Sequence, residues 1–195
     1  MINNSNLSFL DNKIKQKYGS RKGLLYFWVN KILFHFGWFN RRKKIDWPSI
    51  DRLVFVCQGN ICRSAYADVL ARSEGIESCS FGLNTVDGAK ANDRAILMAE
   101  KLDCSLLEHR TTTYKKMVFT DKDLVIVMEP AQLRDVINRT ENRYQYTLLG
   151  LWGRVKSPYI HDPYSSSEEY FETCFNVIEA AVYAIIQEVR AVKKK

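Results

Sequence analysis

The sequence predicts an α/β protein of three layers, in which a four-stranded parallel sheet carries helices on both faces, preceded by a helical N-terminal extension. Two observations predict this architecture. Four short apolar runs of strand length alternate with segments of helical pattern after residue 50. One of these runs, residues 124–128, is apolar at every position, which is typical of a strand buried on both faces of a sheet. Strands that alternate with helices pair in parallel and are covered on both sides.

The first 50 residues differ in composition from the remainder, and we expect two parts: an extension (residues 1–50) and an α/β domain (residues 51–195). Residues 1 to about 20 are polar and rich in lysine, and we expect loose order at the terminus itself. Residues 21–44 predict one helix rich in aromatic residues. Its 16 central residues, 24–39, would reach about 24 Å, short of the ~20 residues that a membrane-spanning helix needs.

The segment 21–44 has two interpretations. Basic residues flank its aromatic side chains, which suits a helix lying on an anionic membrane surface. The alternative is a helix packed against the α/β domain or a partner. Packing is favoured because apolar residues surround much of the helix instead of forming one face.

The elements of the α/β domain follow a turn at residues 46–48, where Pro48 interrupts the pattern. Asn92 or Asp93 is expected to cap one helix, and Pro130 to open another. We expect strands over 53–56, 79–81, 124–128 and 146–149, and helices over 65–73, from 92 or 93 to about 102, 130–139 and 167–192.

Charge and cysteine content exclude several classes of function. The net charge is +7, but the first 50 residues hold ten lysines and arginines against two aspartates, while the other 145 hold 19 basic and 20 acidic residues. The basic character belongs to the extension, so a nucleic-acid partner is not expected. Five cysteines without CxxC pairs argue against a disulfide framework and a structural metal.

The chain is expected to be cytoplasmic, or peripheral at the inner membrane surface if the extension binds lipid. The apolar run 24–39 lacks a small-residue cleavage site, and four basic residues follow it, so it does not have the pattern of an export signal. A reactive thiolate is also most easily kept in a reducing compartment.

The loop between the first strand and the first helix of the domain predicts an anion site. Unpaired backbone N–H groups and the helix dipole favour a phosphate there. Cys57 at the strand end would be a thiolate nucleophile, and Arg63 offers a bidentate fork for two phosphate oxygens. Gly59 and Asn60 tolerate the positive φ that such a loop requires. The residues expected to bind phosphate are Gln58, Gly59, Asn60, Ile61, Cys62, Arg63 and Ser64.

Over about residues 51–190 the chain resembles the low-molecular-weight protein tyrosine phosphatase family, through this Cys-x5-Arg-Ser loop and a later segment, His161-Asp162-Pro163-Tyr164. The resemblance implies metal-independent hydrolysis of phosphotyrosine through a cysteinyl phosphate on Cys57, with no cofactor. It assigns Asp162 as the general acid that protonates the tyrosyl oxygen. It implies that Tyr164 forms an aromatic wall beside the substrate ring.

Four further residues have expected roles around the loop. The Ser64 hydroxyl can donate to the Cys57 sulfur, and Asn60 is expected to maintain the loop through its own hydrogen bonds. The resemblance implies that His109 braces the loop through Asn60, and that Cys62 traps an oxidised Cys57 as a reversible disulfide. The chain departs from the family after His109, where Thr111 and Thr112 stand in the place of an arginine that often supports the loop.

Three branches of the family share the loop, and the residues favour the tyrosine phosphatases. Related arsenate reductases need two further cysteines close together, whereas Cys79 and Cys104 are 25 residues apart. Related protein arginine phosphatases carry a threonine where Ile61 stands, and an apolar side chain there favours an aryl phosphate. Residues 148–152 and 160–164 resemble bacterial members acting on tyrosine kinases of polysaccharide export. A phosphotyrosine-binding or membrane-adaptor module without hydrolytic activity is the alternative from another class.

Overall fold

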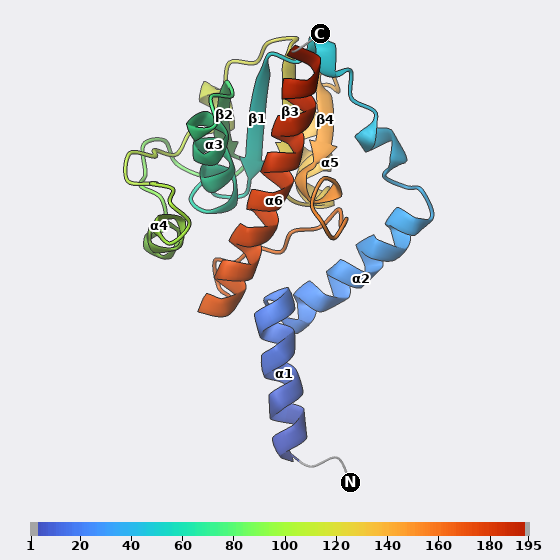
Figure 1. Ribbon diagram of the computed structural model, residues 1–195, viewed down its shortest axis with the longest axis vertical. Helices are drawn as coiled ribbons and strands as arrows, with labels where there is room; N and C mark the ends of the chain where they lie inside the picture. Colours follow the sequence, from blue (N-terminus) through green and yellow to red (C-terminus); the bar gives the residue numbers. More distant parts are fainter. Residues whose placement is uncertain (1–3, 194–195) are drawn as a thin grey trace.

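A computed structural model describes residues 4–193 of the chain (Figure 1). The four strands pair in parallel in the order β2-β1-β3-β4. The predicted three-layer α/β fold is confirmed. The strands are β1 (Arg52–Cys57), β2 (Ser78–Gly82), β3 (Asp123–Val127) and β4 (Gln145–Leu148). The helices of the domain are α3 (Arg63–Ser73), α4 (Asp93–Glu100), α5 (Pro130–Arg139) and α6 (Glu168–Lys193).

The central strands bury both of their faces, and alternate residues enter two separate cores. Leu53 and Phe55 of β1 pack with α3 and the long helix α6, which crosses this face of the sheet in Figure 1. Val54 and Val56 point to the opposite face, where the core includes side chains of α5. This double burial explains why the runs lack the polar alternation of a half-exposed strand. Asn92 caps α4 by accepting a hydrogen bond from the Arg94 amide at 3.1 Å.

The extension is largely helical over its described length, and one expectation about it is corrected. Helix α1 occupies Asn4–Tyr18 and packs on α6 and on the next helix. At residues 1–3 the expectation of loose order lies outside the described part of the chain. Helix α2 spans Arg21–His35, so the expectation that residues 21–44 form one helix is wrong. The chain then turns through Gly37, at φ 76°, into a separate 3₁₀ turn at Asn40–Lys43.

The extension joins the α/β domain through its C-terminal part as well. Phe39 is buried in the core on the α5 side of the sheet. The Thr147 hydroxyl donates to the Arg42 carbonyl at 2.7 Å, and Gln145 Oε1 accepts from the Asp46 amide at 2.8 Å, so the segment is tied to β4. A 3₁₀ turn at Trp47–Ser49 then leads into β1. Further 3₁₀ turns lie at Tyr114–Lys116 and Leu149–Leu151.

Candidate active site

Cys57 ends β1 at the carboxyl edge of the sheet, and its side chain is buried. Two donors face its sulfur: the Ser64 hydroxyl lies 3.0 Å from Cys57 Sγ, and the Asn60 amide donates to the sulfur at 3.2 Å. Helix α3 begins at Arg63, so its N-terminus also points toward this region. The sulfur therefore faces two hydrogen-bond donors and the positive end of the α3 dipole.

Asn60 connects the loop to the start of α3 and to two distant parts of the chain. Its backbone has φ 56°, in the left-handed region that asparagine tolerates. Its Nδ2 donates to the hydroxyls of Ser64 and Ser80, each at 2.9 Å, and its Oδ1 accepts from the Thr112 amide at 2.9 Å. Its carbonyl lies 2.7 Å from His109 Nε2. The loop is therefore braced from α3, from β2 and from the segment that follows α4.

Two of these contacts bear on the expectations for residues 109–112. His109 contacts the carbonyl of Asn60, in the bracing position that the resemblance implied. Burial lowers the pKa of His109, which favours the neutral ring. Where the family often has a supporting arginine, the backbone amide of Thr112 supports Asn60 instead. A backbone donor of this kind depends little on the side chain that carries it.

A second row of polar residues, missed by the sequence reasoning, lies behind Asn60. Asp68 on α3 accepts from the hydroxyls of Ser78 and Ser80 on β2, at 2.7 and 3.1 Å. Ser80 also accepts a hydrogen bond from Asn60 Nδ2, so Asp68 supports Asn60 through Ser80. The available signal was helical spacing: Ser64, Asp68 and Arg72 stand four residues apart on α3, and the first two are buried.

Arg63 is 1% exposed and is held between two carboxylates. Its Nη1 donates to Glu129 Oε1 at 3.0 Å and to the Ile160 carbonyl at 2.9 Å, and its Nη2 donates to Asp162 Oδ2 at 2.6 Å. Burial disfavours its charge, but Asp162, Cys57 and Glu129 together outweigh burial and raise the pKa of Arg63. The guanidinium is thus a permanent cation beside the nucleophile.

Glu129 is the other site residue that the sequence reasoning missed. It stands between β3 and α5, and Gln132 donates to the same carboxylate oxygen, Oε1, at 2.8 Å. The signal in the sequence was its place at the carboxyl end of a central parallel strand, where sites of this fold class form. Its carboxylate orients Arg63 through Nη1, while Asp162 accepts from Nη2.

The segment that contains Asp162 and Tyr164 is half exposed and anchored by α4. The Asp162 side chain is 42% exposed, and its Oδ1 accepts from the Tyr164 amide at 3.2 Å. Arg94 of α4 donates to the Ser166 carbonyl at 2.9 Å. The Tyr164 side chain is exposed beside Asp162. Asp162 and Cys57, 105 residues apart, therefore share Arg63 as a common neighbour.

Cys62 is buried in the loop, and both it and Cys57 are free thiols. Burial and the neighbouring Cys57 raise the pKa of Cys62 well above its ordinary value, which favours the neutral Cys62 thiol. Within residues 4–193, no group of three or more histidine, cysteine or acidic side chains is placed to hold a metal ion.

Comparison with known proteins places this site in a family. Residues 52–195 match the family model described as low molecular weight phosphotyrosine protein phosphatase. A probable low molecular weight protein-tyrosine-phosphatase, AmsI of Erwinia amylovora, is 32% identical over 136 residues, which cover 68% of this chain and 92% of the relative. Wzb of Salmonella typhi, a low molecular weight protein-tyrosine-phosphatase, is 27% identical over 148 residues, covering 74% and 98%.

Solved structures agree with these relatives. The tyrosine phosphatase Wzb from Escherichia coli K30, in complex with sulphate, has a TM-score of 0.59 at 32% identity and covers 74% of this chain and 98% of its own. An arginine phosphatase, YwlE from Geobacillus stearothermophilus, has a TM-score of 0.66 at 21% identity, covering 73% and 95%, and this likeness shows the fold alone. The resemblance noted in the sequence is confirmed: the chain belongs to the low molecular weight phosphotyrosine protein phosphatase family.

Proposed function

We propose that the protein hydrolyses phosphotyrosine in protein substrates through a cysteinyl phosphate on Cys57. The observation that carries the proposal is the arrangement at the end of β1. Two hydrogen-bond donors face the Cys57 sulfur, and Arg63 lies between the loop and Asp162. A stabilised nucleophile, an adjacent cation and a carboxylic acid are the three groups that phosphoryl transfer from a phenol requires.

The first step joins sulfur to phosphorus. The Cys57 thiolate attacks phosphorus, the bond to the tyrosyl oxygen breaks, and that oxygen takes the proton of Asp162. In the second step Asp162, now a carboxylate, removes a proton from water, which attacks phosphorus and expels the thiolate. The Ser64 hydroxyl, 3.0 Å from the sulfur, stabilises the thiolate as it leaves. The loop amides and Arg63 bind the oxygens of the phosphoryl group in both steps.

The contacts of Arg63 suggest how phosphate binding rearranges the site. Its Nη2 donates to Asp162 Oδ2 at 2.6 Å. A phosphate dianion that takes over Nη2 would release the Asp162 side chain from Arg63 and leave it free to approach the tyrosyl oxygen. Glu129 would keep Nη1 in place during the exchange.

Tyrosine is favoured over arginine as the phosphorylated residue. Ile61, half-buried in the loop, presents an apolar side chain that suits a phenyl ring better than a guanidinium group. The relatives named as tyrosine phosphatases reach 32% identity, whereas the arginine phosphatase noted above is 21% identical. The exposed ring of Tyr164 supports an aromatic wall on the other side of the substrate.

Turnover in the presence of EDTA tests the proposal. The wild-type protein should hydrolyse p-nitrophenyl phosphate and a phosphotyrosine peptide, and should prefer the latter to a phosphoarginine peptide. Cys57→Ser should be inactive. No turnover by the wild type, or undiminished turnover by Cys57→Ser, would contradict the mechanism. Retained binding of phosphopeptide by an inactive wild type would instead support a binding module.

The physiological substrate under this proposal is a bacterial tyrosine kinase of polysaccharide export, reached at the inner surface of the membrane. The support is an apolar face on α2 (Arg21–His35) and the residue after it. Leu25, Trp28, Val29, Ile32 and Phe36 are between 44% and 83% exposed. At helical spacing these five residues, which we call the outer face, lie opposite the side that packs on the α/β domain.

The outer face has the composition of an interfacial helix. Basic residues stand on α2 itself and at residues 41–44, and aromatic rings at Trp28 and Phe36 suit the headgroup region. No described helix is long and apolar enough to cross a membrane. The outer face would therefore lie on a lipid surface, with electrostatic attraction to anionic headgroups.

Co-sedimentation with vesicles tests the membrane part separately. The wild type should bind vesicles that contain phosphatidylserine, more strongly at low salt, and should bind neutral phosphatidylcholine vesicles weakly. The double variant Trp28→Ser, Ile32→Ser should lose most of this binding. Leu97→Ser is the matched control, because Leu97 is 60% exposed but lies on α4. Equal sedimentation of the wild type and the double variant would refute the membrane role.

A further inference from the structure

The corner between α1 and α2 (residues 18–23) contacts the residue that precedes Asp162. We infer that this corner is part of the catalytic apparatus: it holds His161, and His161 is a positioning residue that fixes the Asp162 carboxylate. The inference rests on the proposed function, because it assigns a role to groups around the general acid of that reaction. It gives the extension a task in catalysis that is separate from membrane binding.

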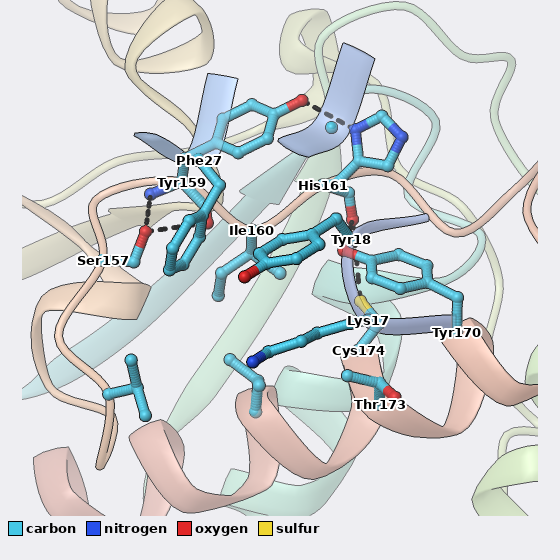
Figure 2. A pocket seen from close by; sticks show the side chains of 13 residues that line it. Lys17, Tyr18, Phe27, Ser157, Tyr159, Ile160, His161, Tyr170, Thr173 and Cys174 are labelled. Carbon is cyan, nitrogen blue, oxygen red and sulfur yellow. Dashed lines mark hydrogen bonds between the residues drawn. The ribbon is translucent and has the colours of Figure 1, made fainter. Parts of the chain in front are cut away.

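Both ring nitrogens of His161 are occupied. The Ser20 hydroxyl lies 3.1 Å from Nε2. The Tyr159 hydroxyl lies 2.7 Å from Nδ1, and Figure 2 draws the hydrogen bond between Tyr159 and His161. Ser20 also caps α2 by accepting from the Gly23 amide at 2.9 Å, so its own hydrogen is available for Nε2. In that arrangement the Nδ1 proton is donated to Tyr159. Two hydrogen bonds from opposite sides fix the rotation of the imidazole ring.

The corner is shaped to approach this ring closely. Gly19 has φ 77°, and a methyl group built on it would overlap His161 Cδ2. A methyl group on Gly23 would lie 3.0 Å from the same atom, tighter than ordinary van der Waals contact. The turn after α1 therefore needs glycine for its backbone and for the space it leaves. An extension that only covered the surface would not require this fit around one side chain.

The backbone at His161 is anchored from the other side. Its carbonyl accepts from the Tyr170 hydroxyl at 3.4 Å and from Cys174 Sγ at 3.7 Å, both on α6. The preceding residue, Ile160, donates its amide to the Met128 carbonyl at 2.9 Å. Ring and backbone are thus held on both sides, and Asp162 is the next residue. A rotation of the backbone at His161 would move the Asp162 carboxylate relative to Arg63.

The side chains around these contacts do not fill all of the space between the extension and α6. A cavity of about 170 Å³ lies beside His161, between the extension and α6 (Figure 2). Tyr18 and Phe27 of the extension line it together with Ile160 and Tyr170 of the domain. Because the packing there is incomplete, the hydrogen bonds of Ser20 and Tyr159 have a larger share in restraining His161. Small displacements of a general acid cost rate even when the fold is intact.

A positioning role and a merely structural role predict different kinetics. Protonation of the leaving oxygen matters greatly for phenyl phosphate, whose phenol resembles tyrosine, and much less for p-nitrophenyl phosphate, whose phenol is far more acidic. Partial unfolding lowers kcat/KM for both substrates by the same factor. The ratio of the two kcat/KM values, measured on one sample, therefore reports the general acid and not the amount of folded enzyme.

The test uses the full chain with Tyr159→Phe and Ser20→Ala. We expect kcat/KM for phenyl phosphate to fall about tenfold in each, with a change of less than about twofold for p-nitrophenyl phosphate, since a general acid supplies ~10²–10⁴ of the rate. Ser20→Thr, which keeps the hydroxyl, should restore the ratio. Thr173→Val is the matched control, because it removes the hydrogen bond from Thr173 to the Gln16 carbonyl, 3.2 Å, without touching His161.

The outcomes separate this inference from the proposed function. An unchanged ratio in both Tyr159→Phe and Ser20→Ala would overturn the positioning role, and so would an equal change in Thr173→Val. A wild type that hydrolyses neither substrate would contradict the proposed function itself. The inference is supported if kcat/KM for phenyl phosphate, divided by kcat/KM for p-nitrophenyl phosphate, falls in Tyr159→Phe and in Ser20→Ala. The same ratio should stay at the wild-type value in Ser20→Thr and in Thr173→Val.

Discussion

Replacing Asn60 by alanine should destabilise the protein by about 4 kcal/mol. The variant loses three buried side-chain hydrogen bonds, to Ser64, Ser80 and the Thr112 amide, at about 1 kcal/mol each. Alanine also tolerates the backbone at φ 56° less well than asparagine, which adds about 1 kcal/mol. For a chain of this size each kcal/mol lowers Tm by about 2–4 °C, so the expected fall is about 8–16 °C.

Urea denaturation measures this change, and Asn142→Ala separates its two components. Asn142 has the same φ, 56°, but it is exposed and outside the site, so its replacement should cost only about 1 kcal/mol. Asn60→Gly should recover about 1 kcal/mol relative to Asn60→Ala, because glycine accepts positive φ without strain. If Asn60→Ala were no less stable than Asn142→Ala, the hydrogen bonds of Asn60 would not hold the loop.

Three further predictions concern the acid, the buried histidines and the second cysteine. Asp162→Asn should lower kcat/KM for phenyl phosphate by ~10²–10⁴ but leave competitive inhibition by phosphate intact; weakened inhibition would mean that Asp162 builds the anion site. Burial lowers the pKa of His109 and of His161, so the folded state binds fewer protons than the unfolded one, and the free energy of unfolding should fall as pH drops below about 6.5. Urea denaturation at pH 7.5 and 5.5 measures this difference in the free energy of unfolding, and the difference should be smaller in His109→Gln. An equal difference in the wild type and in His109→Gln would show that His109 does not contribute to it. After peroxide treatment dithiothreitol should reactivate the wild type but not Cys62→Ala, and equal recovery would exclude Cys62 as the partner of Cys57.

The fold and the phosphate loop were predictable because their signals are local. Each strand is a short apolar run, and the loop from Cys57 to Ser64 combines a strand end, residues that accept positive φ and a helix start. Such signals extend over a few residues and do not depend on the rest of the chain. The pairing of this loop with Asp162 came from family resemblance, since nothing local connects residues so far apart.

The remaining site residues depend on tertiary contacts. Glu129, Asp68 and Ser80 act only because β3, α3 and β2 bring them to the loop, and each is a common residue in an ordinary sequence context. Thr112 contributes a backbone amide, which no side-chain pattern can reveal. Arg63 was recognised as an anion ligand, but its position between two carboxylates depends on segments that lie 66 and 99 residues further along the chain.

The bounds of helix α1 were not predicted, for a related reason. The sequence of α1 is polar and carries only a weak apolar stripe, so local preference alone predicts little. Its contacts with α2 and α6 decide the outcome. The hydrogen bond from Thr173 to the Gln16 carbonyl joins α1 to α6. The ion pair of Asp11 with Arg21, at 2.6 Å, joins α1 to α2. Tertiary packing commonly stabilises helices of this kind.

Packing and membrane binding were opposed as interpretations of α2, yet its geometry allows both at once. Gly23 and Asn30 are buried on one side, and the outer face lies on the opposite side, which explains why apolar residues surround the helix. A lipid surface on the outer face would leave the contacts of the corner with His161 in place. We therefore expect anionic vesicles to leave kcat/KM for p-nitrophenyl phosphate unchanged within about twofold, and to raise the rate on a phosphotyrosine peptide anchored in the same vesicles through higher local concentration. Strong inhibition or activation of the small substrate by vesicles would mean that lipid displaces α2 from the domain, and that the two faces of the helix are coupled through His161.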